Sequence, residues 1–210
     1  IEGSMIDQLD HPNIVRVFER GESTDSHYLV MEYLEGITLA DRITEKKQLD
    51  IPETISIMKQ CLSAVQTIHS KGIIHRDLKP ENIMLLEQAN KRFPLVKLLD
   101  FGLAKSETMT KMTMTGMVMG TSNYIAPEQL TGEQVTFASD IYSLGVIFYE
   151  MLAGERLFTG ESEEAVFHQI LAMKRIELKD KRPDIQSDLN DLIMSMIDKS
   201  INARPSSTDI

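Results

Sequence analysis

The chain has 210 residues, of which 42% are apolar and 26% charged, the composition of an ordinary globular protein with a substantial core. Its net charge of -10 argues against nucleic acid or an acidic membrane surface as the main partner. The single cysteine, Cys61, excludes an intramolecular disulfide and fits a reducing compartment, and no apolar run is long enough to span a membrane.

The first part of the chain predicts a helix end, a β-hairpin and a short helix. Residues 2–9 resemble the end of a helix that stops before Pro12, because proline disfavours the α conformation of the preceding residue. Two β-rich runs at 14–18 and 28–31 predict the strands of a hairpin, and residues 39–47 predict a short polar helix.

An amphipathic helix is predicted from Asp50 to Ser70. Pro52 is a favoured first-turn residue, and Gly72 can end the helix in a left-handed conformation. Its apolar face is drawn by side chains at three- and four-residue spacing: Ile55, Met58, Leu62, Val65 and Ile68. Cys61 lies in this stripe and is expected to be a small core residue.

Two short apolar runs, 83–86 and 95–99, predict a pair of strands, whereas residues 103–123 show no periodicity and predict a loop. Residues 139–152 are apolar nearly all round, which predicts a buried central helix that ends at Gly154.

The end of the chain predicts two further helices, at 163–173 and 187–197, with Ser187 as the cap of the second. Residues 206–209 have the composition of another helix start, which we expect this chain not to complete.

Three motifs carry the chemistry of the chain. They are His75–Asn82 (HRDLKPEN), Asp100–Gly102 (DFG) and Ala126–Glu128 (APE). The first supplies in Asp77 a carboxylate that can take a proton from a hydroxyl, and Asn82 and Asp100 are oxygen ligands of the kind that magnesium prefers. Three motifs in this order and spacing indicate a phosphoryl-transfer site far more specifically than one motif alone.

On these motifs the chain resembles the eukaryotic-type (Hanks-type) protein kinases, and Lys79 is typical of the serine/threonine branch. The segment 120–129 (GTSNYIAPEQ) is most similar to bacterial members. The resemblance implies an α+β, two-lobed protein kinase-like fold. A partial small lobe with the end of a helix, two strands and the hinge would occupy residues 1–34, and a mostly helical large lobe residues 35–210.

The resemblance further implies an ATP-dependent enzyme that transfers the γ-phosphate of ATP to serine or threonine hydroxyls of a protein substrate. Asp77 would orient the hydroxyl and accept its proton, and Lys79 would offset charge on the γ-phosphate. Asn82 and Asp100 would hold Mg²⁺. His75 would then be a structural residue rather than an acid or base.

The same resemblance places adenine at residues 28–34. Backbone groups of Glu32 and Leu34 would bind the base, Met31 would stand at the back of the pocket, and Met84 would line the nucleotide site. An edge strand without a ligand is the alternative interpretation of this run.

Regulation is implied by Arg76, which in the family reads a phosphate on the loop after Asp100–Gly102. Thr113 and Thr115 stand where related bacterial kinases are phosphorylated, and a phosphothreonine can order a loop by pairing with arginine. Thr121 is expected to contact the catalytic residues rather than to act as a switch. The alternative is a set of plain loop threonines.

The methionines of this loop are either partly buried or a docking surface for a second kinase molecule. In the second case the enzyme would form a homodimer for trans-autophosphorylation.

Two scaffold predictions come from the same resemblance. Asp140 on the predicted central helix should tie down the catalytic loop, since a buried carboxylate needs partners. Glu128 and Arg204 match an ion pair that anchors the activation segment in the family.

The glycine-rich loop and the ATP-binding strand lysine of the family do not occur in this sequence. Glu2 would pair with that lysine; otherwise it is a solvent-facing helix glutamate. We therefore expect an internal fragment with little catalysis of its own, from a cytoplasmic protein or the cytoplasmic domain of a membrane-anchored one.

Two other functions stay open: a catalytically silent kinase-like interaction module and a small-molecule phosphotransferase. Ala126–Glu128 and the threonine-rich loop favour protein substrates over the latter.

Overall fold

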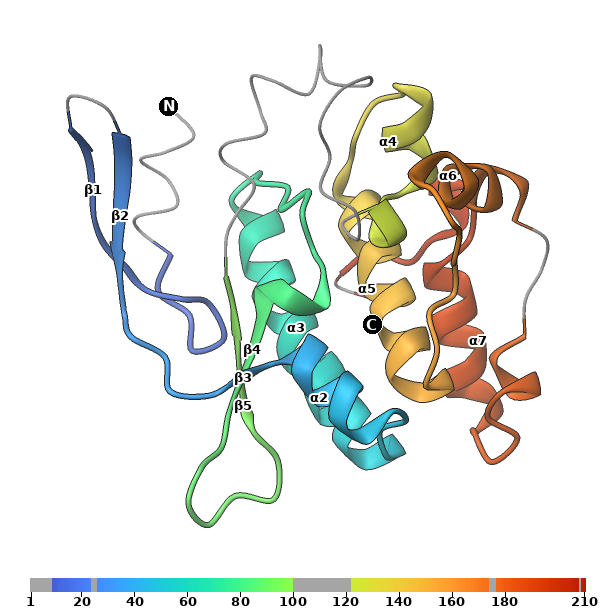
Figure 1. Cartoon of the computed structure of the whole chain (residues 1–210), viewed down its shortest axis with the longest axis horizontal. Coiled ribbons are helices and arrows are strands. Elements are labelled where there is room, and N and C mark those ends of the chain that lie inside the picture. Colours follow the sequence, from blue (N-terminus) through green and yellow to red (C-terminus); the bar gives the residue numbers. More distant parts are fainter. Residues whose placement is uncertain (1–8, 24–25, 100–121, 174–176, 208) are drawn as a thin grey trace.

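The structure, a computed structural model, describes residues 9–23, 26–99, 122–173, 177–207 and 209–210. Its helices gather on one side and a β-hairpin stands apart on the other (Figure 1). The strands are β1 (Val17–Ser23), β2 (Ser26–Met31), β3 (Ile37–Thr38), β4 (Ile83–Leu86) and β5 (Leu95–Leu98). The helices are α2 (Leu39–Lys46), α3 (Ile51–Ser70), α4 (Pro127–Thr131), α5 (Phe137–Ala153), α6 (Glu163–Ala172) and α7 (Ser187–Met196). The 3₁₀ turns among the described residues are η1 (Pro80–Asn82), η2 (Ser122–Tyr124), η3 (Leu178–Asp180) and η4 (Ile201–Ala203).

The strands form two separate antiparallel sheets. β1 and β2 make the predicted hairpin, and β4 pairs with β5 as predicted, with the short β3 added on the outer side of β4. The first strand begins at Val17 rather than at Ile14 because Ile14 forms a parallel bridge with Leu98 and the N–H of Val15 donates to the Leu98 carbonyl at 2.9 Å. These bonds join the hairpin to the second sheet.

Helix α3 follows the sequence prediction in its bounds, but Ile57 and not the predicted Ile55 lies on its buried face. The carboxylate of Asp50 accepts a hydrogen bond from the N–H of Glu53 at 2.7 Å, and Pro52 occupies the first turn. Gly72 has φ of +74° just beyond the helix, the conformation that glycine adopts without strain. Cys61 is fully buried, and burial raises the pKa of its thiol to about 12, as expected for an inert core residue.

The core is built around α5, whose side chains from Ser139 to Leu152 are all buried. The helix begins at Phe137, slightly before the predicted start, and ends at Gly154 with φ of +77°. A Cβ atom on Gly145 would come within 2.8 Å of the Met196 Cβ, so glycine permits the close approach of α5 and α7. The prediction of a buried central helix is confirmed.

One prediction at the end of the chain is wrong. Ser187 is the first residue of α7 rather than its cap; Gln186 stands at the N-cap position without a side-chain cap bond, and the Ser187 hydroxyl accepts a hydrogen bond from Lys179 Nζ at 2.9 Å. The described residues after Arg204 form a turn in which both the N–H and the hydroxyl of Ser206 donate to Asp209 Oδ2, the bonding expected of a helix start that the chain does not complete. Within the described ranges, no helix has both the length and the hydropathy needed to cross a bilayer.

Candidate active site

The catalytic loop runs from the end of α3 to β4, and its backbone is hydrogen-bonded to α5. Asp140, which is 1% exposed, accepts hydrogen bonds from the backbone N–H groups of His75 and Arg76, both at 2.9 Å. Arg76 has φ of +66°, a conformation that costs free energy for a residue other than glycine and persists only where surrounding bonds enforce it. The prediction that Asp140 ties down this loop is confirmed.

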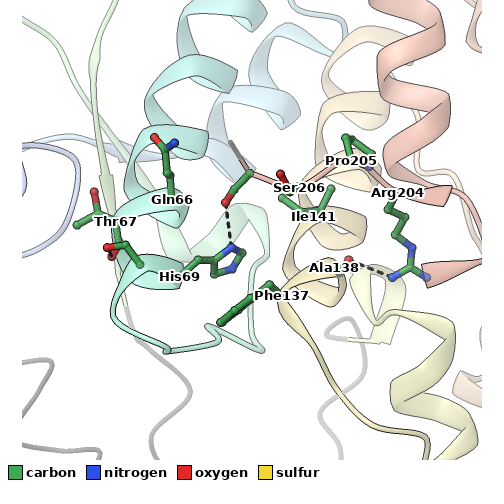
Figure 2. Close-up of a pocket in the computed structure, with 11 residues that line it drawn as sticks. Gln66, Thr67, His69, Phe137, Ala138, Ile141, Arg204, Pro205 and Ser206 are labelled. Atoms are coloured by element: carbon green, nitrogen blue, oxygen red, sulfur yellow. Dashed lines mark hydrogen bonds between the residues drawn. The ribbon is translucent and has the colours of Figure 1, made fainter. Parts of the chain in front are cut away.

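His69 gives Asp140 a further partner that the sequence did not reveal. Its Nε2 lies 2.8 Å from Asp140 Oδ2, its Nδ1 lies 3.2 Å from the Ser207 hydroxyl, and its ring stacks against Phe137 at 4.6 Å. His69 and Arg204 help to line a pocket of about 660 Å³, which does not include Asp77 (Figure 2). A surface pocket and the support of the catalytic loop therefore share one side chain.

His75 is a buried structural residue, as expected. It is fully buried, its Nε2 lies 3.1 Å from the Leu99 carbonyl, and its Nδ1 accepts a hydrogen bond from the Asp77 N–H at 3.4 Å. Burial lowers the pKa of His75, and the opposing effect of Asp140 is smaller. The ring is therefore neutral at pH 7 and occupied on both nitrogens.

Asp77, Lys79 and Asn82 come together at the open face of the loop. Lys79 Nζ lies 3.3 Å from Asp77 Oδ2, and the Asn82 amide nitrogen donates to the Asp77 carbonyl at 2.9 Å and to its Oδ2 at 3.2 Å. Because the amide nitrogen of Asn82 donates to Asp77, the amide oxygen of Asn82 is the atom left to bind a hard cation. The donor set here fits one side of a magnesium site.

The second expected magnesium ligand, Asp100, lies outside the described residues. The residue before it, Leu99, donates from its N–H to the Asn82 carbonyl at 2.8 Å. Within the described ranges, no group of three or more histidine, cysteine or acidic side chains could hold a metal by itself.

The hinge residues follow β2. Met31 ends that strand, and Glu32 and Leu34 lie in the segment that leads to β3, all three partly buried. Met84 lies on β4, where it pairs with Thr38 on one side and Lys97 on the other.

Glu32 forms hydrogen bonds through both its backbone and its side chain with Arg16 and Lys97. Its N–H donates to the Arg16 carbonyl at 2.9 Å, and its Oε1 accepts from the Arg16 N–H at 2.8 Å and from Lys97 Nζ at 2.5 Å. Burial raises the pKa of Glu32, but the hydrogen bonds from Lys97 and Arg16 and their charges outweigh it, so the pKa lies below its ordinary value. The side chain is thus an ionised carboxylate turned toward Lys97.

A second cross-connection missed by sequence reasoning joins residues 11–15 to the helical part. The Asn13 amide donates to Gln60 Oε1 and to the Val96 carbonyl, both at 2.9 Å, and Gln60 Oε1 also accepts from the Val96 N–H at 3.0 Å. Asn13 and Gln60 lie far apart in the sequence, so no local pattern signals their contact. Asn13 is a polar residue that is only 7% exposed, and a buried polar side chain needs a hydrogen-bond partner. Its burial becomes known only from the structure.

The expected ion pair between Glu128 and Arg204 is confirmed. Arg204 binds Glu128 in a two-pronged pair at 2.7 and 2.9 Å, with side-chain exposures of 0% and 2%. Ser139 also donates to Glu128 at 2.7 Å. Burial raises the pKa of Glu128, but the hydrogen bonds from Arg204 and Ser139 lower it by more than burial raises it. The pKa of Glu128 therefore lies below its ordinary value.

Five predicted site residues, Glu2, Asp100, Thr113, Thr115 and Thr121, lie outside the described residues. Their roles, and the catalytic and nucleotide-binding roles of the described residues, remain predictions.

The chain matches the protein kinase domain family over residues 1–210. It belongs to that family. A probable serine/threonine-protein kinase of Clostridium perfringens is 40% identical over 94% of this chain and 28% of its own length. The serine/threonine-protein kinases PrkC of Bacillus subtilis and PknB of Mycolicibacterium smegmatis are 37% and 36% identical over 92% and 93% of this chain, and over 29% and 32% of their own lengths.

The crystal structure of Rad53 1-466 in complex with AMP-PNP matches with a TM-score of 0.81 and 33% identity, covering 99% of this chain and 51% of that chain. The predicted family and fold class are confirmed. The chain spans about a third or less of the length of the curated relatives named above, which are 28%, 29% and 32% covered.

Proposed function

We propose that this chain forms most of the catalytic domain of an ATP-dependent serine/threonine protein kinase, with the small lobe at residues 1–34 and the large lobe at residues 35–210. One observation carries the proposal. The Asp77 carboxylate lies 3.3 Å from Lys79 Nζ and 3.2 Å from the Asn82 amide, on a loop whose backbone is fixed by a buried Asp140. A carboxylate, a cation and an oxygen ligand held in one place are the parts that phosphoryl transfer requires.

In this reaction the hydroxyl oxygen of a substrate serine or threonine attacks the γ-phosphorus of ATP. The bond from that phosphorus to the bridging oxygen breaks, ADP departs, and the hydroxyl proton passes to Asp77. Lys79 offsets negative charge on the phosphoryl group, and the Asn82 amide holds the orientation of Asp77. Magnesium, held by the Asn82 oxygen and Asp100, would neutralise the phosphates.

Adenine would bind to backbone groups of Glu32 and Leu34, between Met31 and Met84. Arg16 and Lys97 bind the Glu32 carboxylate, and Arg16 also accepts its N–H, which leaves the backbone carbonyl of Glu32 as the group to meet the base. The related Rad53 structure holds AMP-PNP, an analogue of ATP. Glu2 would pair with a phosphate-binding lysine.

Activity would be regulated by phosphorylation of Thr113 or Thr115, in trans within a homodimer, with Arg76 as the phosphate reader. In the described part of the chain, Nε of Arg76 is buried and forms no hydrogen bond, so it is suited to an anionic partner. Thr121 would contact the catalytic residues. We place the protein in the cytoplasm, free or as the cytoplasmic domain of a membrane-anchored protein, because its substrate is ATP and its one cysteine is a buried free thiol.

The test is transfer of radiolabelled phosphate from ATP by the complete gene product to protein and small-molecule acceptors. Protein labelling on serine and threonine is expected, and Asp77→Asn should reduce kcat by about 10²- to 10⁴-fold because it removes the proton acceptor. Asp188→Asn, an exposed acidic residue on α7, is the matched control.

Full activity of Asp77→Asn would contradict the proposal. A wild-type protein that binds AMP-PNP but labels nothing would identify the silent module instead, and labelling confined to small molecules would identify the small-molecule phosphotransferase.

A further inference from the structure

Lys97 lies at a junction of three segments. It belongs to β5, and its ammonium group donates to Glu32 Oε1 at 2.5 Å and to the Ile14 carbonyl at 3.2 Å. Its side chain is 12% exposed and that of Glu32 is 27% exposed, so the ion pair is partly shielded from water. Shielded pairs with additional hydrogen bonds are screened less by salt than exposed ones.

The Glu32 end of this pair is itself rigidly placed. The backbone N–H of Arg16 donates to the same Oε1 at 2.8 Å, and the Glu32 N–H donates back to the Arg16 carbonyl at 2.9 Å. The hinge can therefore not rotate about Glu32 without breaking several bonds at once. Through Lys97, this unit is fastened to β5.

The backbone contacts of β5 connect it to Glu32 less directly. The N–H of Val15 donates to the Leu98 carbonyl and the N–H of Leu98 donates to the Asn13 carbonyl, both at 2.9 Å. These bonds hold β5 against residues 13–15, and the next residue, Arg16, bonds Glu32, whereas Lys97 joins β5 to Glu32 in one step. Among the side chains that the structure describes, Lys97 is the one whose hydrogen bonds reach Glu32 from β5.

The two ends of this connection belong to opposite ends of the proposed nucleotide site. Glu32 lies in the adenine-binding segment, and β5 leads directly to Asp100, the expected magnesium ligand. A nucleotide that contacts both ends binds best when their separation is already correct in the free protein, because no ordering cost is then incurred on binding.

We propose that Lys97 is a positioning residue that sets the distance between the adenine-binding hinge and the strand bearing the metal ligand. It does not touch the reacting atoms and acts through Glu32. The inference rests on the function proposed above.

The test compares Lys97→Met, Lys97→Arg and Lys91→Met in the complete gene product. Lys91 is an exposed lysine in the turn between β4 and β5 and serves as the control for loss of one positive charge near the same strand. Equilibrium binding of AMP-PNP with magnesium is measured first, followed by kcat and KM for ATP.

Lys97→Met should weaken AMP-PNP binding about 5- to 10-fold and raise KM for ATP by a similar factor, with kcat changed less than about 2-fold. Lys97→Arg should restore most of the affinity, since arginine also reaches a carboxylate and a carbonyl, and Lys91→Met should match the wild type. In a double-mutant cycle, Glu32→Gln should add little to Lys97→Met, because either change breaks the same pair.

A merely structural lysine would give a different pattern: loss of folded protein lowers kcat per total protein while KM and the AMP-PNP affinity stay unchanged. That result would overturn the inference, and so would tighter binding or higher activity of Lys97→Met. Failure of the proposed function is seen separately, as a wild-type protein that neither binds AMP-PNP nor transfers phosphate.

Discussion

The catalytic loop and the hinge would contact opposite ends of one nucleotide, yet they are held in different ways. The polar side chains that support the catalytic loop and the segment after it are at most 7% exposed: Asp140, His75, Glu128 and Arg204. Asp140 accepts a hydrogen bond from the His75 backbone, and Arg204 binds Glu128. Beside the hinge, the hairpin exposes apolar side chains such as Phe18, at 60%, and Val30, at 42%. The hairpin and the segment before it are joined to the rest of the described structure through a short parallel bridge at Ile14, the hydrogen bonds of the Asn13 amide and the partly exposed ion pair of Glu32 with Lys97.

This difference indicates which end of the site is held more tightly. Buried, fully bonded polar groups have one low-energy arrangement, because any other leaves a group desolvated and unpaired. The partly shielded Lys97–Glu32 pair also positions its end of the site, but water can partly replace a contact that is lost there. We therefore expect substitutions around the loop to have large effects and substitutions beside the hinge to have smaller ones.

The largest effect on stability should come from Arg204→Met. The change leaves Glu128 as a buried carboxylate without its cation, which should lower the free energy of unfolding by about 3–5 kcal/mol. Urea unfolding of the complete gene product measures it. Lys181→Met, which breaks the exposed pair of Lys181 with Glu155, is the control and should cost at most about 1 kcal/mol. Equal losses for the two variants would remove the distinction between buried and exposed regions.

Asp140→Asn should have the next largest effect, on the rate. The two carboxylate oxygens of Asp140 accept from the N–H groups of His75 and Arg76, one each. In asparagine one of these oxygens is replaced by an NH₂ group, which cannot accept, so one hydrogen bond is lost and the loop must shift. We expect kcat to fall about 100-fold, equivalent to roughly 2.7 kcal/mol, in a protein that stays folded by circular dichroism. A variant with normal kcat would show that the loop keeps its shape without Asp140.

The two histidines with lowered pKa values extend the comparison to pH. Burial lowers the pKa of His75 in the catalytic loop, and burial followed by the charge of Lys97 lowers that of His11 in the segment at residues 11–15. In each case the unfolded chain binds the proton more readily, so stability is complete above the ordinary value of 6.5 and is lost as the pH falls from there through the folded-state pKa.

Each such group contributes at most about 1.4 kcal/mol per pH unit. Urea midpoints at pH 7.5 and 5.5 should show that His75→Gln removes more of the acid sensitivity than His11→Gln, since His75 is the more deeply buried. The reverse ranking would mean that the segment at residues 11–15 is the more tightly held of the two.

The smallest effect is expected at Phe18, whose ring lies 5.6 Å from the Arg16 guanidinium carbon on the exposed hairpin. Phe18→Leu keeps an apolar side chain but removes the aromatic face, and should cost at most about 0.5–1 kcal/mol in urea unfolding. A loss as large as that of Arg204→Met would place the hairpin among the rigid parts of the molecule.

Much of the fold was predictable because its signals are local. The Asp50 cap, Pro52 and the apolar stripe defined α3 within a residue, and the nearly continuous apolar run defined α5. Predictions failed where a residue found its partner in another element. Ile14 is not part of the first strand because it pairs with Leu98 on β5, and the Ser187 hydroxyl bonds Lys179 instead of capping α7.

The motifs at 75–82, 100–102 and 126–128 by themselves determined the family, because phosphoryl transfer needs those residue types at those spacings. They did not determine which side chains support the site. His69, Gln60, Asn13 and Lys97 have no motif, since a hydrogen bond between distant segments leaves no periodic trace in either one. Only the tertiary structure decided that His69 joins Asp140 beside the catalytic loop and that β5 meets the hinge through Lys97, because these contacts exist only once the packing of the core has brought the segments together.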